Sequence, residues 1–265
     1  MLLLIDVGNT NTSFALYRER EALGHWRLST ARERTAEEYA ALLLQLMSIG
    51  GFSRESVGAV VVSSVVPQTV FPLRKMSERF FACRAFVVGE DVPIPIANKL
   101  INPREAGADR LINALAAVRR YPAPLIIVDF GTATTFDVID DEGAFLGGII
   151  APGVNLSIEA LHRAAAKLPH IAVEPPPQVI GRSTVQAMQS GVFFGYVGLI
   201  EGLAHRVQAE YGKTMTIIAT GGLAPLFARH CKLVEHVDPD LTMIGLVEVY
   251  LLNREIIRSG KKATQ

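Results

Sequence analysis

The sequence is poor in cysteine and has no long apolar run, and each absence excludes a class of protein. Only two of the 265 residues are cysteines, Cys83 and Cys231, too few for a disulfide scaffold or a thiolate metal site. No stretch approaches the roughly 18 apolar residues that cross a bilayer. The N-terminal MLLLIDVGNTNT lacks the basic leading segment, longer apolar stretch and cleavage site of a secretory signal. We therefore expect a cytoplasmic protein with no membrane partner.

Neither sign of charge is in excess. Lysine plus arginine and aspartate plus glutamate number 26 each, which gives a formal net charge of zero. A broad nucleic-acid footprint would need a basic surplus, so we expect no nucleic-acid partner. The 49% hydrophobic and 20% charged content is typical of a globular chain and too apolar for disorder.

What the sequence does contain is an internal repeat. Residues 4–16 read LIDVGNTNTSFAL and residues 127–139 read IVDFGTATTFDVI. Each segment is an apolar strand that runs into an acid, a glycine and a polar cluster before a second apolar stretch, a pattern typical of a β-hairpin. Aligned without a gap, the repeat matches Asp6 with Asp129, Gly8 with Gly131, and Thr12 with Thr135.

The elements after each hairpin also repeat. In the first half, Thr35 and Glu38 form a capping box that begins a helix, and Gly50–Gly51 end it. The other expected elements of this half are a strand at 25–29, a strand at 57–62, a helix after Pro67 and a strand near 85–88. The second half is expected to hold a strand near 144–150, a helix at 156–167, a longer helix from about 183 and a strand at 215–219.

Each half therefore has the order β-β-β-α-β-α, a mixed sheet covered by helices. This predicts an α/β fold of two duplicated, ribonuclease H-like lobes, an N-terminal lobe at 1–120 and a C-terminal lobe at 121–265, with a nucleotide cleft between them. The arrangement resembles the actin, sugar kinase and Hsp70 superfamily, whose lobes close on ATP.

The first hairpin turn has the groups that triphosphate binding needs. Gly8 permits a close backbone approach, and successive N–H groups in such a turn can face a phosphate oxygen. Asp6 cannot face phosphate directly, so we expect it to hold Mg²⁺ through water. One such turn is often only a structural hairpin, but its repetition strengthens the functional interpretation. The sequence has no G-x-x-x-x-G-K-[ST] motif, which argues against a P-loop enzyme.

The second turn, from Asp129 to Thr135, could hold the other end of the phosphate chain, with Asp129 on a cation. A third glycine element, ATGG at 219–222, lies between a strand and a helix. It could bring backbone close to a nucleotide or be a plain structural turn, and the sequence favours neither.

Asp109 and Arg110 lie near the start of a helical pattern that stops before Tyr121. Asp109 could simply complement the helix dipole, an effect of about 0.3–1 kcal/mol. Alternatively, it could be a general base that takes the proton of a substrate hydroxyl. Arg110 would then donate to a substrate carboxylate. Spacing alone leaves both interpretations open.

Seven motifs together resemble those of type III pantothenate kinases, in the family order and over nearly the whole chain. They are DVGNTNT at 6–12, SSVVP at 63–67, NPREAGADR at 102–110, DFGTATT at 129–135, GGIIAPG at 147–153, IGRST at 180–184 and ATGG at 219–222. The resemblance implies ATP-dependent phosphorylation of pantothenate, the first step of coenzyme A biosynthesis. It also implies a homodimer with substrate and cation sites at the subunit interface.

The resemblance assigns roles to individual residues. Asp109 would be the proton acceptor, and Asp129 would bind a monovalent cation, K⁺ or NH₄⁺. The residues implied to contact ATP and its Mg²⁺ are Asp6, Val7, Gly8, Asn9, Thr10, Asn11, Thr12 and Thr132. The residues implied to contact pantothenate are Gly107, Ala108, Asp109, Arg110 and Thr184.

One position departs from the family pattern. Many members have a tyrosine that contacts pantothenate where this sequence has Leu100, so either the pocket wall is apolar here or affinity is altered. Two alternative functions also remain: a non-catalytic nucleotide-binding regulator on the same scaffold, and another small-molecule kinase of the superfamily. Fold alone does not certify chemistry.

Overall fold

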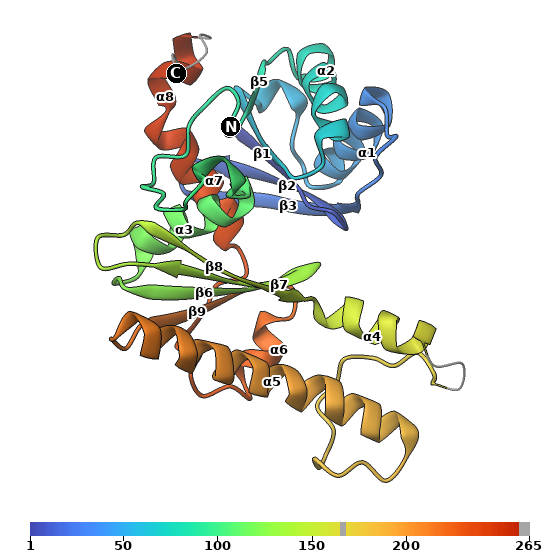
Figure 1. The fold of residues 1–265 in the computed structure, drawn as a ribbon. Helices are drawn as coiled ribbons and strands as arrows, with labels where there is room; N and C mark the ends of the chain where they lie inside the picture. Colours follow the sequence, from blue (N-terminus) through green and yellow to red (C-terminus); the bar gives the residue numbers. More distant parts are fainter. Residues whose placement is uncertain (165–167, 260–265) are drawn as a thin grey trace. The chain divides into compact units, whose positions relative to one another are not determined.

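The structure, a computed structural model, describes residues 1–164 and 168–259. It divides into two units, each built on a five-stranded sheet (Figure 1). Unit 1 comprises residues 1–97, 101–119 and the C-terminal segment from Leu241, and unit 2 comprises residues 98–100 and 120–240.

The sheet of unit 1 has the strand order β3-β2-β1-β4-β5. Its strands are β1 (Leu2–Val7), β2 (Asn11–Arg18), β3 (Glu21–Ser29), β4 (Ala59–Ser64) and β5 (Ala85–Val87). The central strand β1 pairs antiparallel with β2 and parallel with β4, and β4 pairs parallel with β5. The expected strands of this half are therefore present, each within a few residues of its predicted range.

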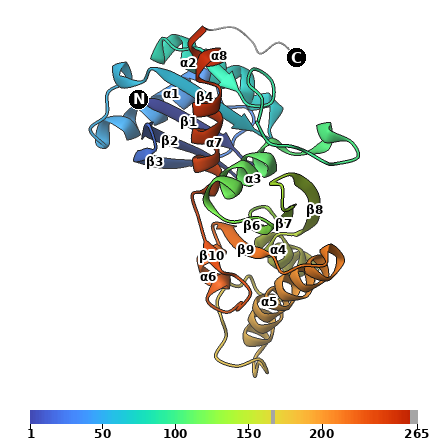
Figure 2. The ribbon, with the colours of Figure 1, turned by 90° about the vertical axis from the view of Figure 1, so that its left-hand side faces the viewer.

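Helices cover both faces of this sheet, because alternate residues of β1 are buried on opposite sides. Leu3, Ile5 and Val7 pack with α1 (Ala36–Ile49) and α2 (Val70–Phe81). Leu2 and Leu4 pack with the other helices of the unit. These helices are α3 (Ala108–Arg120), α7 (Leu241–Leu252) and α8 (Arg254–Ser259). Figure 2 shows α7 lying along the sheet on this side. The unit also has three short 3₁₀ turns, η1 (Arg54–Ser56), η2 (Pro67–Thr69) and η3 (Pro103–Glu105).

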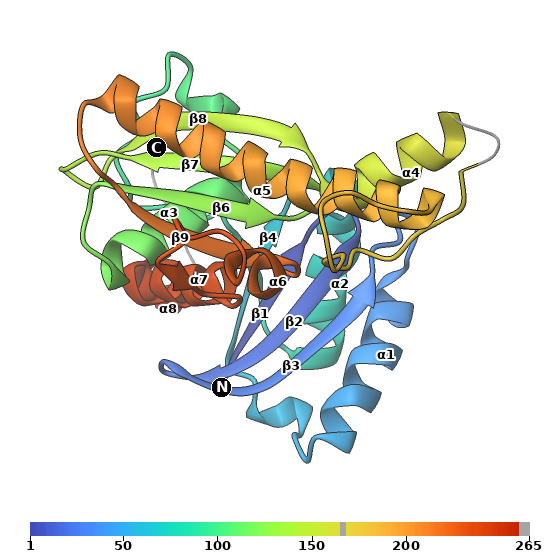
Figure 3. The same cartoon turned by 90° about the horizontal axis from the view of Figure 1, so that it is seen from below.

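The sheet of unit 2 has the order β10-β9-β6-β7-β8. Its strands are β6 (Leu125–Phe130), β7 (Ala133–Ile139), β8 (Phe145–Pro152), β9 (Thr216–Gly221) and β10 (His236–Val237). Its helices are α4 (Val154–Ala164), α5 (Thr184–Tyr211) and α6 (Ala224–Ala228). Side chains from all three helices share one core with Ile126 and Val128, and Figure 3 shows α5 crossing this face. The predicted end of the helix at 156–167 lies outside the described residues.

The two sheets have the same topology. In both, a central strand pairs antiparallel with the next strand of the chain and parallel with the strand after the intervening helices. The predicted duplication is therefore confirmed, with a fifth strand in each sheet. Unit 2 departs from the order β-β-β-α-β-α in having two helices, α4 and α5, between β8 and β9.

The strand register corrects one detail of the repeat. Thr12 pairs with Val7, and the residue that pairs with Phe130 is Thr134. The second hairpin turn is one residue shorter than the first, so Thr134, and not Thr135, is the counterpart of Thr12. An ungapped alignment could not reveal this difference in turn length.

Helix ends follow the sequence signals. Thr35 caps α1 in a complete capping box with Glu38, and Gly50 is the C-cap. Ser183 caps α5 by accepting from the Gln186 N–H, and Gly212, with φ of 82°, ends it in the left-handed conformation that glycine favours.

A close helix crossing fixes α3 in unit 1. A Cβ atom added at Gly245 of α7 would lie 2.3 Å from the carbonyl oxygen of Ile112 of α3, so only glycine permits this approach. One helical turn away, the Thr242 hydroxyl donates to Oδ1 of Asn113, which is buried, at 2.7 Å. The C-terminal segment thus positions the helix that begins with Ala108 and Asp109.

In unit 2, α4 and the first turns of α5 extend together beyond the edge of the sheet (Figure 1). Thr184 lies at this projecting end, as the first residue of α5. None of the helices within residues 1–164 and 168–259 combines the length and apolar character needed to cross a membrane.

Candidate functional site

The first hairpin turn lies at the carboxyl end of the central strand of unit 1. Asp6 is half-buried near the end of β1, whereas Asn9 and Thr10 are exposed. The Gly8 N–H donates to the Asn11 carbonyl at 2.9 Å and closes the turn. In open α/β sheets, ligands bind outside the carboxyl ends of the strands. The turn is thus where the fold can present backbone and polar side chains to a ligand.

Thr30, which follows β3, braces this turn, a role that the sequence did not reveal. Its hydroxyl donates to the Gly8 carbonyl at 2.7 Å and accepts from the hydroxyl of Thr12, 3.0 Å away. Its N–H donates to the Thr10 carbonyl at 2.9 Å. Thr12 is completely buried, so the bond to Thr30 gives a partner to a hydroxyl that water cannot reach. Three contacts from one residue therefore fix the backbone of the turn.

Strand register places a hydroxyl on each side of each aspartate. Asp6 pairs with Ser13 of β2 and Ser63 of β4. In unit 2, the same positions beside Asp129 hold Thr135 of β7 and Thr220 of β9. Residues paired in register point to the same face of a sheet. Each unit therefore has a carboxylate flanked by two hydroxyl residues on one face.

Helix α3 brings Asp109 to the face that carries Asp6. Leu4 of β1, two residues before Asp6 and therefore on its face, shares a buried core cluster with Ile112 and Leu115 of α3. Asp109 lies in the first turn of this helix. Within unit 1, the fold thus brings two of the sequence-predicted acids to one side of the sheet.

The carboxylate of Asp109 lies against the backbone of Gly107, so a side chain at residue 107 would displace it. A Cβ atom added at Gly107 would lie 2.5 Å from Oδ1 of Asp109. The same Oδ1 accepts from the Arg110 N–H at 2.9 Å, an interaction that fits a carboxylate complementing the dipole at the start of α3. Asp109 and Arg110 are both half-buried, so each still has surface that a substrate could contact.

The second hairpin turn is packed by glycines from two other motifs. A Cβ atom added at Gly153, just before α4, would lie 2.1 Å from the Thr132 carbonyl oxygen. At the end of β9, Gly221 has φ of 87°, and a Cβ atom there would lie 2.6 Å from Oδ1 of Asp129. The motifs DFGTATT, GGIIAPG and ATGG therefore meet at Asp129 and Thr132, and side chains larger than hydrogen are excluded around them.

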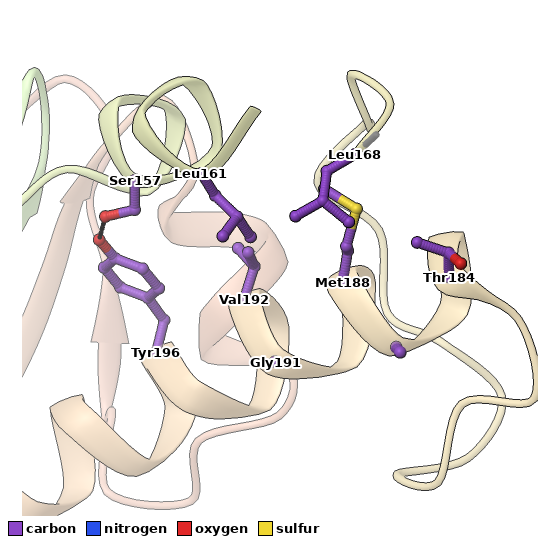
Figure 4. A pocket seen from close by; sticks show the side chains of 9 residues that line it. Ser157, Leu161, Leu168, Thr184, Met188, Gly191, Val192 and Tyr196 are labelled. Carbon is purple, nitrogen blue, oxygen red and sulfur yellow. Dashed lines mark hydrogen bonds between the residues drawn. The ribbon is translucent and has the colours of Figure 1, made fainter. Parts of the chain in front are cut away.

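Thr184 lies elsewhere in unit 2. It lines a pocket of about 530 Å³ between α4 and α5, whose walls are mainly the apolar side chains of Leu161, Met188 and Val192 (Figure 4). At the opposite end of the pocket from Thr184, the hydroxyls of Ser157 and Tyr196 are hydrogen-bonded at 2.6 Å. Such a pocket could hold a mostly apolar molecule with one polar end.

Leu100 belongs to unit 2 and packs against β8. Its side chain lies 3.2 Å from where a Cβ atom of Gly147 would be. The preceding residue, Lys99, donates its N–H to the Phe145 carbonyl at 2.8 Å. Its ammonium group pairs with Asp140 at 2.6 Å, and hydrogen bonding to that carboxylate raises the pKa of Lys99. Leu100, at the position where many family members have tyrosine, is thus held against β8, the strand that contains most of the GGIIAPG motif.

Within residues 1–164 and 168–259, no three His, Cys, Asp or Glu side chains come together as metal ligands. A magnesium ion needs no such cluster, because it usually keeps several waters and binds one or two carboxylates plus substrate phosphates. Asp6, with hydroxyl residues on both neighbouring strands, fits a cation held in this way.

The family model that matches this chain, over residues 2–206, is described as type III pantothenate kinase. A type III pantothenate kinase from Paramagnetospirillum magneticum (strain ATCC 700264 / AMB-1) is 53% identical over 259 residues, which cover 97% of this chain and 100% of that protein. A solved structure from Campylobacter jejuni, described as a Baf family transcriptional activator, has a TM-score of 0.57 and 19% identity over 96% of this chain and 99% of its own.

A solved structure from Porphyromonas gingivalis, described as an N-acetylglucosamine kinase, has a TM-score of 0.50 and 15% identity over 96% of this chain and 100% of its own. At such low identities, likeness to a solved structure is informative about fold alone. The predicted sugar kinase type of fold is confirmed.

Thr12 and Thr134 occupy equivalent positions in the two units and allow a matched test of the contact between Thr30 and the first turn. Thr12→Val should lower the free energy of unfolding by about 1–3 kcal/mol, because it removes a buried hydrogen bond to Thr30. Thr134→Val should leave stability unchanged or raise it, because the buried Thr134 hydroxyl has no hydrogen-bond partner in the described chain. Urea unfolding of both variants measures the difference, and equal losses would contradict the assignment of the brace.

Proposed function

Because this chain belongs to the type III pantothenate kinase family, we propose that it transfers the γ-phosphoryl group of ATP to the terminal hydroxyl of pantothenate. The products are 4′-phosphopantothenate and ADP, in the first step of coenzyme A biosynthesis. The observation that carries the proposal is the family match over residues 2–206, with about half the residues identical in a relative that aligns over its full length.

The turn from Asp6 to Thr12 would bind the phosphates of ATP. Its geometry supports this role, since Thr30 fixes the backbone at Gly8 and leaves Asn9 and Thr10 exposed. Asp6 would hold Mg²⁺ through water, and the cation would offset the charge that moves during phosphoryl transfer. Thr132, in the corresponding turn of unit 2, would contact ATP as well.

Asp109 would take the proton from the pantothenate hydroxyl as it attacks the γ-phosphorus. Gly107 and Ala108 would line the substrate site beside it, and Arg110 would pair with the pantothenate carboxylate through its planar guanidinium. The support is local: α3 presents Asp109 on the face of the sheet that carries Asp6. General-base catalysis of this kind contributes about 10²–10⁴-fold.

Asp129 would bind the monovalent cation, K⁺ or NH₄⁺. Its carboxylate is confined by the backbone of Gly221, where any side chain would collide with Oδ1. A confined carboxylate at the end of a strand, close to the carbonyl groups of a tight turn, is a suitable oxygen environment for a hard cation.

A homodimer would complete the substrate site through the projecting α4 and α5. Several apolar side chains on and next to α4 and the start of α5 are exposed, and an interface would cover them. They are Ile150, Leu156, Leu161, Ile180 and Val185. Thr184, which precedes Val185 in α5, would contact pantothenate at the interface.

The catalytic proposal predicts that Asp109→Asn lowers pantothenate-dependent ADP release by at least about 10²-fold, because the amide cannot accept the proton. The thermal unfolding midpoint should stay within the range of the wild type. Glu210→Gln, at an exposed position near the end of α5, is the control and should keep full activity. Normal turnover by Asp109→Asn would remove this residue from the mechanism.

Wild-type protein that binds ATP but never phosphorylates pantothenate, with Mg²⁺ and K⁺ present, would favour a regulatory function.

The dimer proposal is tested by Leu156→Glu, which places a charge on the exposed face of α4. Sedimentation equilibrium should show a dimeric wild type and a monomeric variant, because an unpaired charge is costly to bury in an interface. Ile49→Glu makes the same change at an exposed site at the end of α1 and should stay dimeric. A monomeric wild type, or a dimeric Leu156→Glu variant, would contradict the proposal.

A further inference from the structure

Two strand residues of the described chain carry buried hydroxyls without a hydrogen-bond partner. They are Ser63 of β4 and Thr134 of β7, and both side chains are completely buried. A buried polar group that makes no hydrogen bond destabilises the fold, so each such group needs an explanation.

The two hydroxyls face different surroundings. Thr134 points to the side of β7 that carries Phe136, a residue of the apolar core under α5. Ser63 pairs in register with Asp6 and points to the same face as its carboxylate. Only the Ser63 hydroxyl therefore lies beside a charged group of the proposed ATP site.

Ser64, the next residue along β4, has the hydrogen bonds expected of a serine with a structural role. The Ser64 hydroxyl donates to the Val66 carbonyl at 3.0 Å and accepts from the Val66 N–H at 3.0 Å. It also lies 3.1 Å from the Thr69 hydroxyl. Ser64 thus stabilises the loop between β4 and α2, whereas Ser63 contributes no such bond.

We propose that Ser63 is a positioning residue for the magnesium ion of bound ATP, acting through an ordered water beside Asp6. This inference rests on the proposed function. A serine hydroxyl can accept a hydrogen bond from a cation-bound water, and magnesium keeps several of its waters when it binds to proteins. Because the site offers Asp6 as a carboxylate and no cluster of three or more ligating side chains within the described residues, a neighbouring hydroxyl would fix the orientation of the hydrated ion.

The test measures ATP binding in the absence of pantothenate by isothermal titration calorimetry. The measurement is repeated at a series of Mg²⁺ concentrations. For Ser63→Ala, the Mg²⁺ concentration that gives half-maximal ATP affinity should rise about 3- to 10-fold, the effect of losing one hydrogen bond. Its thermal unfolding midpoint should equal or exceed that of the wild type, because an unpartnered buried hydroxyl is removed. Ser63→Thr keeps the hydroxyl and should retain the wild-type Mg²⁺ dependence.

Ser64→Ala is the matched control. It should lower the unfolding midpoint, because it removes the loop hydrogen bonds, and leave the Mg²⁺ dependence of ATP binding unchanged. An unchanged Mg²⁺ dependence in Ser63→Ala, an equal shift in Ser63→Thr, or loss of folding in Ser63→Ala would each overturn the inference. Failure of the wild type to bind ATP would instead overturn the proposed function, so the two failures are distinguishable.

Discussion

Strand register is the constraint on which the rest of this structure depends. The ladder between β1 and β4 sets Asp6 beside Ser63, and the ladder between β6 and β9 sets Asp129 beside Thr220. A slip of one residue would turn each carboxylate to the opposite face, among the apolar side chains of the core. The opposite face resists such a slip, because Ile5 and Val7 are buried there against α1 and α2, and a slip would bury the charge of the half-buried Asp6 among apolar side chains. The apolar packing on that face therefore helps to keep the carboxylate on the face of the polar site.

The two units share this plan but stabilise their turns differently. Thr30, directly after β3, fixes the first turn through hydroxyl contacts. The position directly after β8 is Gly153, whose backbone approaches the Thr132 carbonyl so closely that a threonine could not fit. The first turn is thus braced by hydroxyls, while the second is one residue shorter and packed by glycine backbone. The same hairpin is therefore stabilised by side-chain hydrogen bonds in one unit and by close backbone contact in the other.

Much of this arrangement was predictable from sequence because the signals are local. The capping box at Thr35 and the repeated hairpins depend on residues a few positions apart, and both predictions are confirmed. The brace by Thr30 was not predictable, since it joins residues about twenty positions apart through a register that sequence does not state. The packing of α7 onto α3 was also not predictable. The sequence of α7, LTMIGLVEVYLL, is apolar on nearly all sides and so does not indicate which side faces α3. Only the structure shows that Gly245 contacts Ile112. The roles of the site residues remain proposals.

The central claim is that the carboxylate at the end of β1 holds the cation of bound ATP. A crystal structure with Mg²⁺ and a non-hydrolysable ATP analogue tests it most directly. The account predicts a metal ion linked to Asp6 through water, with the phosphates lying along the turn from Gly8 to Thr12. A nucleotide whose phosphates and metal bind away from this turn would contradict it.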